Sequence, residues 1–363
     1  MGEWKRVKLG EVADLTWGDT ATTKAKYTDT GYLAYSASGP DGLLPYADFD
    51  REGVVLSAIG ADCGETWLAK GKWSCIKNTI RFWSKCDDVN TAFLYWRTKG
   101  KNLWPKRGSA QPFISQGDAR AMEITYPDLP IQRRIAAVLG ALDDKIEVNR
   151  KICENLEAQA QALFKGMKRR AEESSFVQVI DILSGGTPKT SVPEYWNGDI
   201  PFFSPKDVGG LFTISTERNI TDQGLANCNS ILYPKGTTFV TARGTVGKVC
   251  LAGVPMAMNQ SCFALASNEI DPLLVYFYTC ASVDSLKSKA NGSVFAAITI
   301  AEFETEKIHR LADSEEERFV KTIRPMFDQI LVRQQESRAL AAMRDALLPK
   351  LMSGELVVEK VEG

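Results

Sequence analysis

The sequence predicts an α+β fold in which two similar mixed α/β domains alternate with two long helices that pair as a coiled coil. Three observations predict this fold. Residues 130–167 carry an apolar heptad pattern, a second copy of that segment lies near the C-terminus, and short motifs recur in the segments between the two copies. We therefore divide the chain into 1–129, 130–172, 173–313 and 314–363.

The first domain, 1–129, mixes short strands with turns. The segments VVLSAIG (54–60) and NTIRFW (78–83) are typical of strands, and TAFLYWRTKGKNLW (91–104) is typical of a helix. Seven of the eight tryptophans of the chain lie in this domain. We expect them to build the core, because aromatic side chains of a mixed α/β domain are usually buried; the alternative is a surface that stacks on bases.

The segment that begins at Pro130 is predicted to form one long helix up to about Met167. Apolar residues recur every seven positions in two rows, which is typical of a coiled-coil seam. The rows are Ile135, Leu142, Asn149, Leu156, Leu163 and Leu139, Ile146, Cys153, Ala160, Met167. Proline suits a helix start, and about 40 residues at about 1.5 Å each would give a rod of about 60 Å. Such a rod requires a partner helix.

The second domain, 173–313, shares its plan with the first. Gly60 matches Gly244 at an offset of 184, NTIRF (78–82) matches NQSCF (259–263) at 181, and VADL (12–15) matches VIDI (179–182) at 167. The segment FVTARGTVGKVCLAG (239–253) predicts two strands joined by a glycine-containing turn. RGTVGK lacks the spacing of a phosphate-binding P-loop, which argues against a nucleoside triphosphate site.

The partner of the first helix is predicted to be the segment from Ser314, which aligns with it without a gap at an offset of 184. Arg134 aligns with Arg318, and Leu156 aligns with Leu340. Pro325 falls within this helix, where it costs some stability. Halfway along the seam the polar Asn149 aligns with the polar Arg333. If the two helices run antiparallel, equivalent midpoints face each other, and we then expect these two side chains to lie close together and to fix the register. The alternative is two solvated residues.

Composition limits the classes of function. The formal net charge is −1 and the pI is about 6.1, so any nucleic-acid binding must depend on local patches. The eight cysteines form no C-x-x-C motif, and His309 is the only histidine, which argues against zinc sites and histidine-based triads. No apolar run approaches the roughly 20 residues of a membrane span. We expect a soluble, cytoplasmic protein.

Motifs of catalysis are also missing. We find no N-P-P-[YFW] tetrapeptide of a DNA methyltransferase and no glycine-rich cofactor loop. Asp143, Asp144 and Lys145 fall on the long helix, where we interpret them as solvated charges. The sequence therefore favours a binding protein without metal or cofactor over an enzyme.

The order of the motifs resembles the specificity subunits of type I restriction-modification systems over essentially the whole chain. In the second domain the resemblance rests on GGTPKTS (185–191), YWNGDIPFFSPKDV (195–208), LYPKGTTFVTARGTVGKV (232–249) and MNQSCFAL (258–265). In the first it rests on YLAYSASGPDGLLPYADFD (32–50), VLSAIGADCG (55–64) and LPIQRRIAAVLGALDDKI (129–146). The chain departs from the family at LADSEEER (311–318), where a proline-rich pattern usually stands.

The resemblance implies two target-recognition domains, each reading one half of a split site in double-stranded DNA. It implies that a pair of long antiparallel coiled-coil helices holds these pseudo-symmetric domains apart. It also implies two methyltransferase subunits docked on the helices and a restriction and translocation subunit that joins them. The specificity subunit would be non-catalytic, and S-adenosylmethionine would bind only to the methyltransferase, which methylates adenine. Two such domains on one face of DNA imply half-sites about one helical turn, roughly 34–36 Å, apart.

Base edges and phosphates are contacted by Arg, Lys, Asn, Gln, Ser and Thr on exposed loops. The candidates in the first domain are Ser36, Ser38, Lys77, Asn78, Lys106, Arg107 and Gln111. Those in the second are Lys189, Ser204, Lys206, Arg243, Lys248, Asn259 and Gln260. Two alternative functions stay open: a coiled-coil scaffold with no DNA role, and a self-contained DNA modification enzyme.

Overall fold

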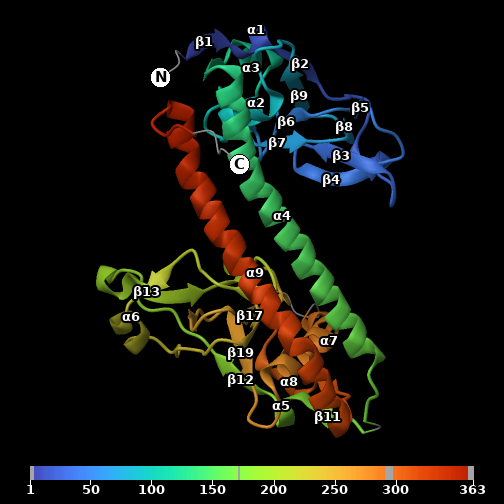
Figure 1. Cartoon of the computed structure of the whole chain (residues 1–363). Coiled ribbons are helices and arrows are strands. Elements are labelled where there is room, and N and C mark those ends of the chain that lie inside the picture. The colour runs from blue at the N-terminus through green and yellow to red at the C-terminus, as the bar shows by residue number, and fades with distance from the viewer. Residues whose placement is uncertain (1–3, 171, 291–296, 359–363) are drawn as a thin grey trace. The chain divides into compact units, whose positions relative to one another are not determined.

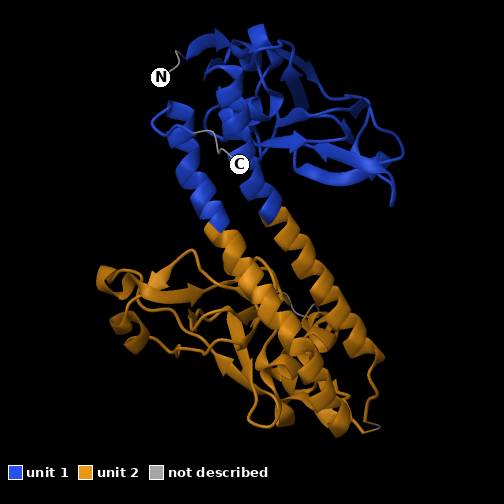
Figure 2. Cartoon of the chain, in the orientation of Figure 1, with its two compact units in different colours: residues 1–145, 340–363 blue, residues 146–339 orange. Residues whose placement is uncertain are grey.

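The computed structural model describes residues 4–170, 172–290 and 297–358, which form two compact units. Unit 1 comprises 1–145 and 340–363, and unit 2 comprises 146–339 (Figure 2). Each long helix is shared between the units, so the units cut across the helices that the sequence-based division placed in segments of their own. In the described residues no helix is long and apolar enough to cross a membrane.

Unit 1 contains two four-stranded sheets and a two-stranded ribbon. The first sheet has the order β2 (Ala13–Trp17), β9 (Thr79–Ser84), β6 (Gly53–Ser57), β7 (Thr66–Ala69), and the second has the order β4 (Gly39–Leu44), β3 (Tyr32–Ser36), β8 (Lys72–Cys75), β5 (Phe49–Asp50). The ribbon pairs β1 (Lys5–Lys8) with β10 (Glu123–Tyr126). The helices are α1 (Leu9–Val12), α2 (Thr91–Thr98), α3 (Gln116–Ala121) and the 3-10 turn η1 (Lys24–Lys26).

Unit 2 likewise contains two sheets and a two-stranded ribbon. Its larger sheet has the order β12 (Asp181–Ser184), β19 (Cys262–Ala266), β16 (Thr238–Thr241), β17 (Val249–Ala252), β14 (Phe212–Thr213), and its smaller sheet has the order β15 (Asn219–Ile220), β13 (Trp196–Phe203), β18 (Ala257–Met258). The ribbon pairs β11 (Ser174–Ser175) with β20 (Lys307–Ile308). The helices are α5 (Phe176–Val179), α6 (Asp222–Ala226), α7 (Pro272–Ala290), α8 (Ile300–Glu304) and the turns η2 (Pro193–Tyr195) and η3 (Pro205–Asp207).

The two units repeat one topology, which confirms the predicted tandem plan. The antiparallel order β2-β9-β6-β7 of unit 1 recurs as β12-β19-β16-β17 in unit 2. In both smaller sheets an inner strand has one antiparallel and one parallel neighbour. Strand β3 pairs antiparallel with β4 and parallel with β8, and β13 pairs antiparallel with β15 and parallel with β18. Both terminal ribbons are antiparallel.

Strand register corrects one part of the predicted repeat. Val54 pairs with Phe82, and its equivalent Thr238 pairs with Leu265, so the offset between β9 and β19 is 183 and not 181. Asn78 is consequently equivalent to Ser261, and Asn78 and Asn259 do not occupy equivalent positions. A shift of two positions keeps the same side chains on the same face of a strand, so the apolar pattern alone does not reveal it.

The long helices are α4 (Leu129–Gly166) and α9 (Asp313–Ser353) (Figure 1). The first turn of α4 closes on the carbonyl oxygen of Asp128, and the first turn of α9 closes on that of Ala312. Pro325 is accommodated inside α9, more than three turns from its start, where its ring is exposed. The departure from the family pattern at 311–318 therefore leaves the helix start almost where the sequence predicted it.

Within each unit the two helices lie side by side and run antiparallel. In unit 2, Phe164 of α4 packs on Phe319 of α9 with ring centroids 5.4 Å apart, and the Cys153 thiol lies 3.7 Å from the carbonyl oxygen of Ile330. Leu163, which the heptad pattern placed in the seam, is 37% exposed, whereas Phe164 is buried. A helix of 3.6 residues per turn drifts from a strict seven-residue repeat, which explains this shift by one position.

Four of the seven tryptophans of the first domain are buried: Trp73, Trp83, Trp96 and Trp104. Trp73 packs between Tyr35 and Phe49, with centroid distances of 5.8 and 4.6 Å. These contacts confirm that most of the tryptophans build the core. Trp17 differs, since it is 37% exposed at the end of β2.

A buried amide holds the start of α4 against unit 1. Gln132 is fully buried, and its Nε2 donates to the carbonyl oxygens of Pro127 and Asp88 at 2.7 and 2.9 Å. Its Oε1 accepts from the backbone N–H of Asn90, the N-cap residue of α2, at 2.9 Å. All its polar atoms are satisfied, so this one side chain ties α4 to both β10 and α2.

The equivalent position in α9, at the helix offset of 184, is Glu316. Its carboxylate receives two hydrogen bonds of 2.9 Å from Arg310 and one of 3.0 Å from the hydroxyl of Tyr278 on α7. Hydrogen bonding to Glu316 raises the pKa of Arg310. Both long helices are therefore anchored to their own unit by a largely buried polar side chain in the first turn.

We predict that Gln132→Ala lowers the free energy of unfolding by about 1–3 kcal/mol, because it leaves the Asn90 N–H and two carbonyl groups buried without partners. Urea unfolding followed by circular dichroism would measure the loss. Gln159→Ala is the matched control on the exposed surface of α4 and should change stability by less than about 0.5 kcal/mol. Equal effects of the two substitutions would contradict an anchoring role for Gln132.

Candidate nucleic-acid interface

Four loops of unit 2 meet at one edge of its larger sheet. They are 185–189 after β12, 204–207 after β13, 242–248 between β16 and β17, and 259–261 before β19. Antiparallel pairing of β19 with both β12 and β16 brings the ends of these strands together. We call these four segments the unit 2 loop edge.

Backbone hydrogen bonds join the four loops. The N–H groups of Ala242, Asn259 and Gly186 donate to the carbonyl oxygens of Ser261, Phe203 and Met258 at 2.8, 2.9 and 3.1 Å. A side chain at Gly185 would lie 2.4 Å from the carbonyl oxygens of Met258 and Asn259, so glycine is required at this crossing. The loop edge is therefore a braced surface and not a set of independent loops.

All seven sequence candidates of the second domain lie on this edge. Five of them are exposed: Lys189, Lys206, Arg243, Lys248 and Gln260. Within the described part of the chain, the four cationic side chains of this set form no ion pair. Ser204 and Asn259 have structural partners instead. The Ser204 hydroxyl donates to Asp207 at 2.7 Å in a capping box, and Asn259 Oδ1 accepts from the N–H of Ser261 at 2.9 Å.

Unit 1 builds the corresponding edge from the same elements. The unit 1 loop edge comprises 18–22, 36–38, 58–65, 76–78 and 106–113. The N–H of Ala58 donates to the carbonyl oxygen of Asn78 at 3.0 Å, just as that of Ala242 donates to Ser261 in unit 2. The N–H groups of Ile114 and Ile298 likewise donate to the equivalent carbonyl oxygens of Ala58 and Ala242.

The first-domain candidates separate into exposed and engaged residues. Ser38, Lys77, Lys106 and Gln111 are exposed, and Asn78 is half-buried in a left-handed conformation with φ 71°. The prediction that Ser36 is an exposed candidate is wrong. Ser36 is 2% exposed, and its hydroxyl donates to Asp41 at 2.7 Å. A buried, satisfied hydroxyl has no free group for a base edge.

Arg107 is exposed but paired. Its guanidinium donates to Asp118 at 2.6 Å, and the same carboxylate accepts from the hydroxyl of Ser115, the N-cap residue of α3. Hydrogen bonding to Arg107 lowers the pKa of Asp118. Arg107 therefore braces the loop against α3, and any contact with a ligand would compete with this ion pair.

Two exposed aromatic residues, one on the unit 1 loop edge and one directly before it, were not among the sequence candidates. Phe113 is 38% exposed, and its backbone pairs with both Ile59 and Arg107; Trp17 precedes Gly18 at the end of β2. In unit 2, Thr187 was also missed, although its hydroxyl donates to the side chain of Gln260. An aromatic residue next to a strand end was the available signal, but the sequence does not distinguish it from a core residue.

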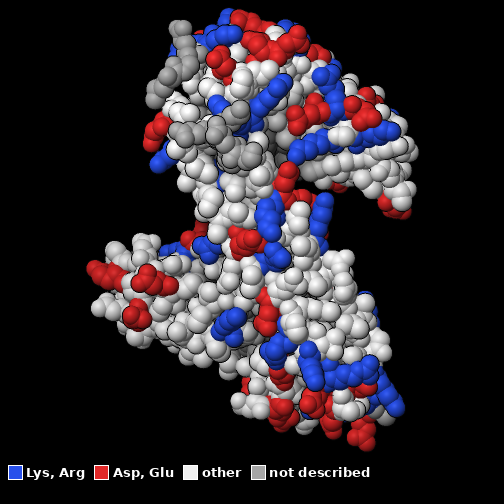
Figure 3. Space-filling model, viewed as in Figure 1, with Lys and Arg blue, Asp and Glu red and all other residues white. Residues whose placement is uncertain are grey.

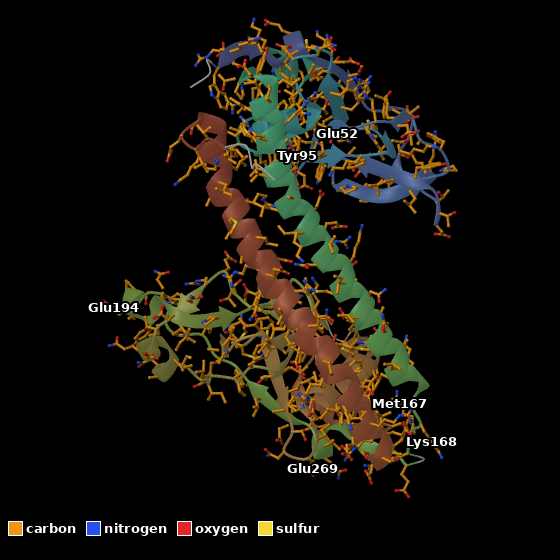
Figure 4. All side chains as sticks on the ribbon, viewed as in Figure 1. Glu52, Tyr95, Met167, Lys168, Glu194 and Glu269 are labelled. Carbon is orange, nitrogen blue, oxygen red and sulfur yellow. The ribbon has the colours of Figure 1, made fainter. Side chains whose placement is uncertain are left out.

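Acidic side chains gather on a different part of unit 2. Glu194, Asp199 and Asp222 are exposed on the lobe formed by η2, β13 and α6 (Figure 3), and Glu194 lies at the outer end of this lobe (Figure 4). Their charge would repel a phosphate backbone, so the unit 2 loop edge is the better nucleic-acid interface. Among the described residues, no group of three or more His, Cys, Asp or Glu is placed to hold a metal ion.

The polar residues of the helix seam meet inside unit 2. Arg333 Nη1 lies 3.5 Å from Asn149 Oδ1, so the predicted proximity is present in the structure. Asn149 is fully buried, and its Nδ2 donates to Glu336 at 2.9 Å and to the hydroxyl of Ser337 at 3.3 Å. Glu336 also accepts from Arg333 at 3.1 Å. That this network fixes the register stays a prediction.

We expect Asn149→Ala to destabilise unit 2 by about 1–3 kcal/mol, because it removes the central partner of a buried network. Val148→Ala is the control, since Val148 is the neighbouring residue on α4 and is 49% exposed. Chemical unfolding of both variants gives the comparison. If Asn149→Ala is as mild as Val148→Ala, the network contributes nothing to stability.

Of the two aspartates on α4, Asp143 is not the solvated charge that the sequence predicted. The Asp143 carboxylate is half-buried and pairs with Arg344 of α9 at 2.5 Å and with Lys99, after α2, at 3.6 Å. Asp144 fits the prediction better, since its exposed carboxylate pairs with Lys70 at 3.2 Å. Asp143 thus links three elements of unit 1, which the sequence does not reveal because its partners are distant along the chain.

Burial raises the pKa of Glu157 on α4, and the nearby Glu154 adds to this increase, while a hydrogen bond from Tyr276 opposes it. A raised pKa in the folded state means that the folded protein binds the proton more tightly than the unfolded chain, whose value is about 4.5. The resulting stability is therefore fully present below that value and is lost as the pH rises through the folded pKa.

Glu157→Gln should therefore be more stable than the parent protein at about pH 8 and equal to it at about pH 4. Unfolding midpoints measured across this range would show the difference. Glu194→Gln serves as the control, because Glu194 is exposed on the lobe formed by η2, β13 and α6, and it should not reproduce this pH dependence. A constant difference at every pH would contradict the assignment.

The family model described as type I restriction modification DNA specificity domain matches residues 1–158 and 170–340. The chain is 30% identical over 157 residues to the type I restriction enzyme MjaIX specificity subunit of Methanocaldococcus jannaschii, covering 42% of this chain and 36% of that protein. It is 24% identical over 302 residues to the EcoR124I/EcoR124II specificity subunit of Escherichia coli, covering 76% and 73%.

One solved structure supports the fold. The S subunit of a type I restriction-modification system from M. genitalium superimposes with a TM-score of 0.63 at 17% identity, covering 99% of this chain and 97% of that one. At this identity the match establishes the shared architecture of two domains and two long helices, and the role of individual side chains has to come from the geometry of this chain.

Proposed function

Because the chain belongs to the type I restriction modification DNA specificity domain family, we propose that it is the sequence-specific DNA-binding subunit of a type I restriction-modification complex. Each unit would read one half of a bipartite site in double-stranded DNA. The observation that carries this proposal is the loop edge, which the chain builds twice with the same backbone and with different exposed side chains.

The chemistry of the edges suits DNA. Exposed cations such as Lys189, Lys206, Arg243 and Lys248 provide contacts to phosphates, although the chain as a whole carries a net charge of −1. Gln260 provides an amide, which can pair with an adenine edge in the major groove. Its equivalent in unit 1, at the offset of 183, is the exposed Lys77, which suits a guanine edge.

We further propose that the long helices carry two methyltransferase subunits and that a restriction and translocation subunit joins the complex. The relatives named above are specificity subunits, which supports this division of labour. In this proposal the chain itself is non-catalytic, binds no cofactor and works in the cytoplasm, while the methyltransferase subunits bind S-adenosylmethionine and methylate adenine. Continuous helical segments of 38 and 41 residues offer the length that such docking requires.

Two other functions make different predictions. A coiled-coil scaffold without a DNA role predicts that removing this chain leaves salt-dependent DNA binding by the complex unchanged. A self-contained modification enzyme predicts methylation of DNA by this chain alone. Footprinting with the partner methyltransferase tests the main proposal, since two protected half-sites support it and one continuous short site, or none, overturns it.

The reading of one half-site by each unit predicts a specific pattern in variants. Gln260→Ala should alter or relax only one half of the methylated motif, and Lys77→Ala should alter only the other half, because each side chain belongs to one loop edge. Methylome sequencing of a host that carries each variant gives the motif directly. Gln159→Ala, exposed on α4, should leave both halves unchanged. Changes in both halves from a single substitution would contradict independent reading.

A further inference from the structure

One lysine in each unit lies across an equivalent glycine of the loop edge. Gly64, between β6 and β7, and Gly247, between β16 and β17, both have left-handed backbone conformations, with φ 96° and 76°. Their N–H groups donate to the last residues of the preceding strands, Ser57 and Thr241, at 2.9 and 2.8 Å. The two glycines therefore occupy the same position in the repeated topology.

In unit 1 the side chain of Lys106 covers this glycine, and in unit 2 the side chain of Lys287 does so. A Cβ atom built on Gly64 would lie 2.5 Å from the carbonyl oxygen of Lys101 and 3.1 Å from Cε of Lys106. One built on Gly247 would lie 2.2 Å from Cε of Lys287. The absence of a side chain lets the aliphatic stem of each lysine lie against the loop, and at Gly64 it also makes room for the backbone of Lys101. The stem holds the ammonium group at the loop edge.

The two lysines reach this position from different places in the fold. Lys106 lies in the segment after α2, whereas Lys287 lies on α7, in its last turn. The equivalent residues Ile114 and Ile298 set the local offset at 184, and this offset aligns Lys106 with Ala290 and not with Lys287. The equivalence is consequently a property of the folded units, and Lys287 was not a candidate from the sequence.

The ammonium groups are available for a ligand. Lys106 is exposed and takes part in no ion pair among the described residues, and Lys287 has a side chain that is 40% exposed, with Asp284 4.0 Å away on the same helix. Each of these loops has a second left-handed glycine, Gly60 in unit 1 and Gly244 in unit 2, with open space around it. No atom lies within 4 Å of a Cβ built on Gly60, and a Cβ built on Gly244 has only Cβ of Pro205 at 4.0 Å. A lysine beside an open glycine loop suits a phosphate group.

We propose that Lys106 and Lys287 are equivalent contacts to the DNA backbone, one for each half-site, which position the duplex without reading its bases. This inference rests on the DNA-binding function proposed above. It goes beyond that function because it separates a sequence-independent contact, shared by both units, from the side chains that differ between them.

The test is the salt dependence of DNA binding by the assembled complex with its methyltransferase subunits. Loss of one phosphate contact lowers the slope of log K against log salt concentration by about 0.9. We expect Lys287→Gln and Lys106→Gln each to reduce the slope by about this amount and to weaken binding to target and to unrelated DNA by the same factor. The methylated motif should stay unchanged.

Lys235→Gln is the matched control for Lys287→Gln. Lys235 is exposed in the same unit and carries the same charge, but it precedes β16, at the end of that strand away from loop 242–248. An unchanged slope for Lys287→Gln, or an equal reduction for Lys235→Gln, overturns the proposal. A changed motif also overturns it, since that would make the lysine a base contact.

Gly247→Ala provides a second variant that keeps the lysine in the chain. The added methyl group would displace the stem of Lys287, so this variant should reproduce the reduced slope of Lys287→Gln. A parental slope for Gly247→Ala contradicts the role of the glycine in placing the ammonium group. If the parent complex shows no salt-dependent binding of DNA at all, the proposed function itself fails, and that outcome differs from all of the above.

Discussion

The constraint on which each unit depends is the buried polar side chain in the first turn of its long helix. Gln132 and Glu316 occupy equivalent positions. The polar atoms of each side chain must form hydrogen bonds with groups of the domain in the same unit. A rotation or a slide of the helix by one residue would break these bonds at a cost in free energy for every buried group left alone. These two side chains therefore fix the rotation and the axial position of the first turn of each helix against its domain. Apolar packing alone would define that position less sharply.

Beyond the anchors, the two units use one topology with different chemistry. Besides the apolar packing of both helices in its core, unit 1 links them to its domain through charged groups, with Asp143 bridging Arg344 and Lys99. Unit 2 uses an aromatic cluster in which Phe277 packs against Phe164, Phe319 and Phe327 with centroid distances of 4.9–5.6 Å. Charged contacts at partly exposed sites are screened by salt, whereas aromatic packing is not. The same architecture thus tolerates different interactions at equivalent places, as the different side chains of the two loop edges also show.

The candidate site was predictable where local sequence decides the conformation. The glycine-containing turn between two apolar strands identified 242–248 correctly, and the exposed cations within it followed from residue type, whereas the predicted strand 54–60 ends at Ser57 and gives way to the loop 58–65. Ser36 and Ser204 were misjudged as free groups, because their partners Asp41 and Asp207 become neighbours only through a turn whose geometry the sequence leaves open. Lys287 was missed for the opposite reason: it lies in a helix, and only the packing of α7 beside loop 242–248 brings it to the edge.

The sequence by itself determined the tandem plan, the two long helices and the family, because heptad periodicity, a constant offset between the helix copies and motif order are all properties of a linear pattern. Only the tertiary structure decided the register of β9 and β19, the burial of Phe164 in place of Leu163, and the role of Asp143. The physical reason is common to the three. In a strand, a shift of two positions preserves the alternation of side chains, and in a helix, a shift of one position changes the apolar face only slightly. An ion pair depends on partners that are distant along the chain. Long-range packing therefore has to select among patterns that are locally equivalent.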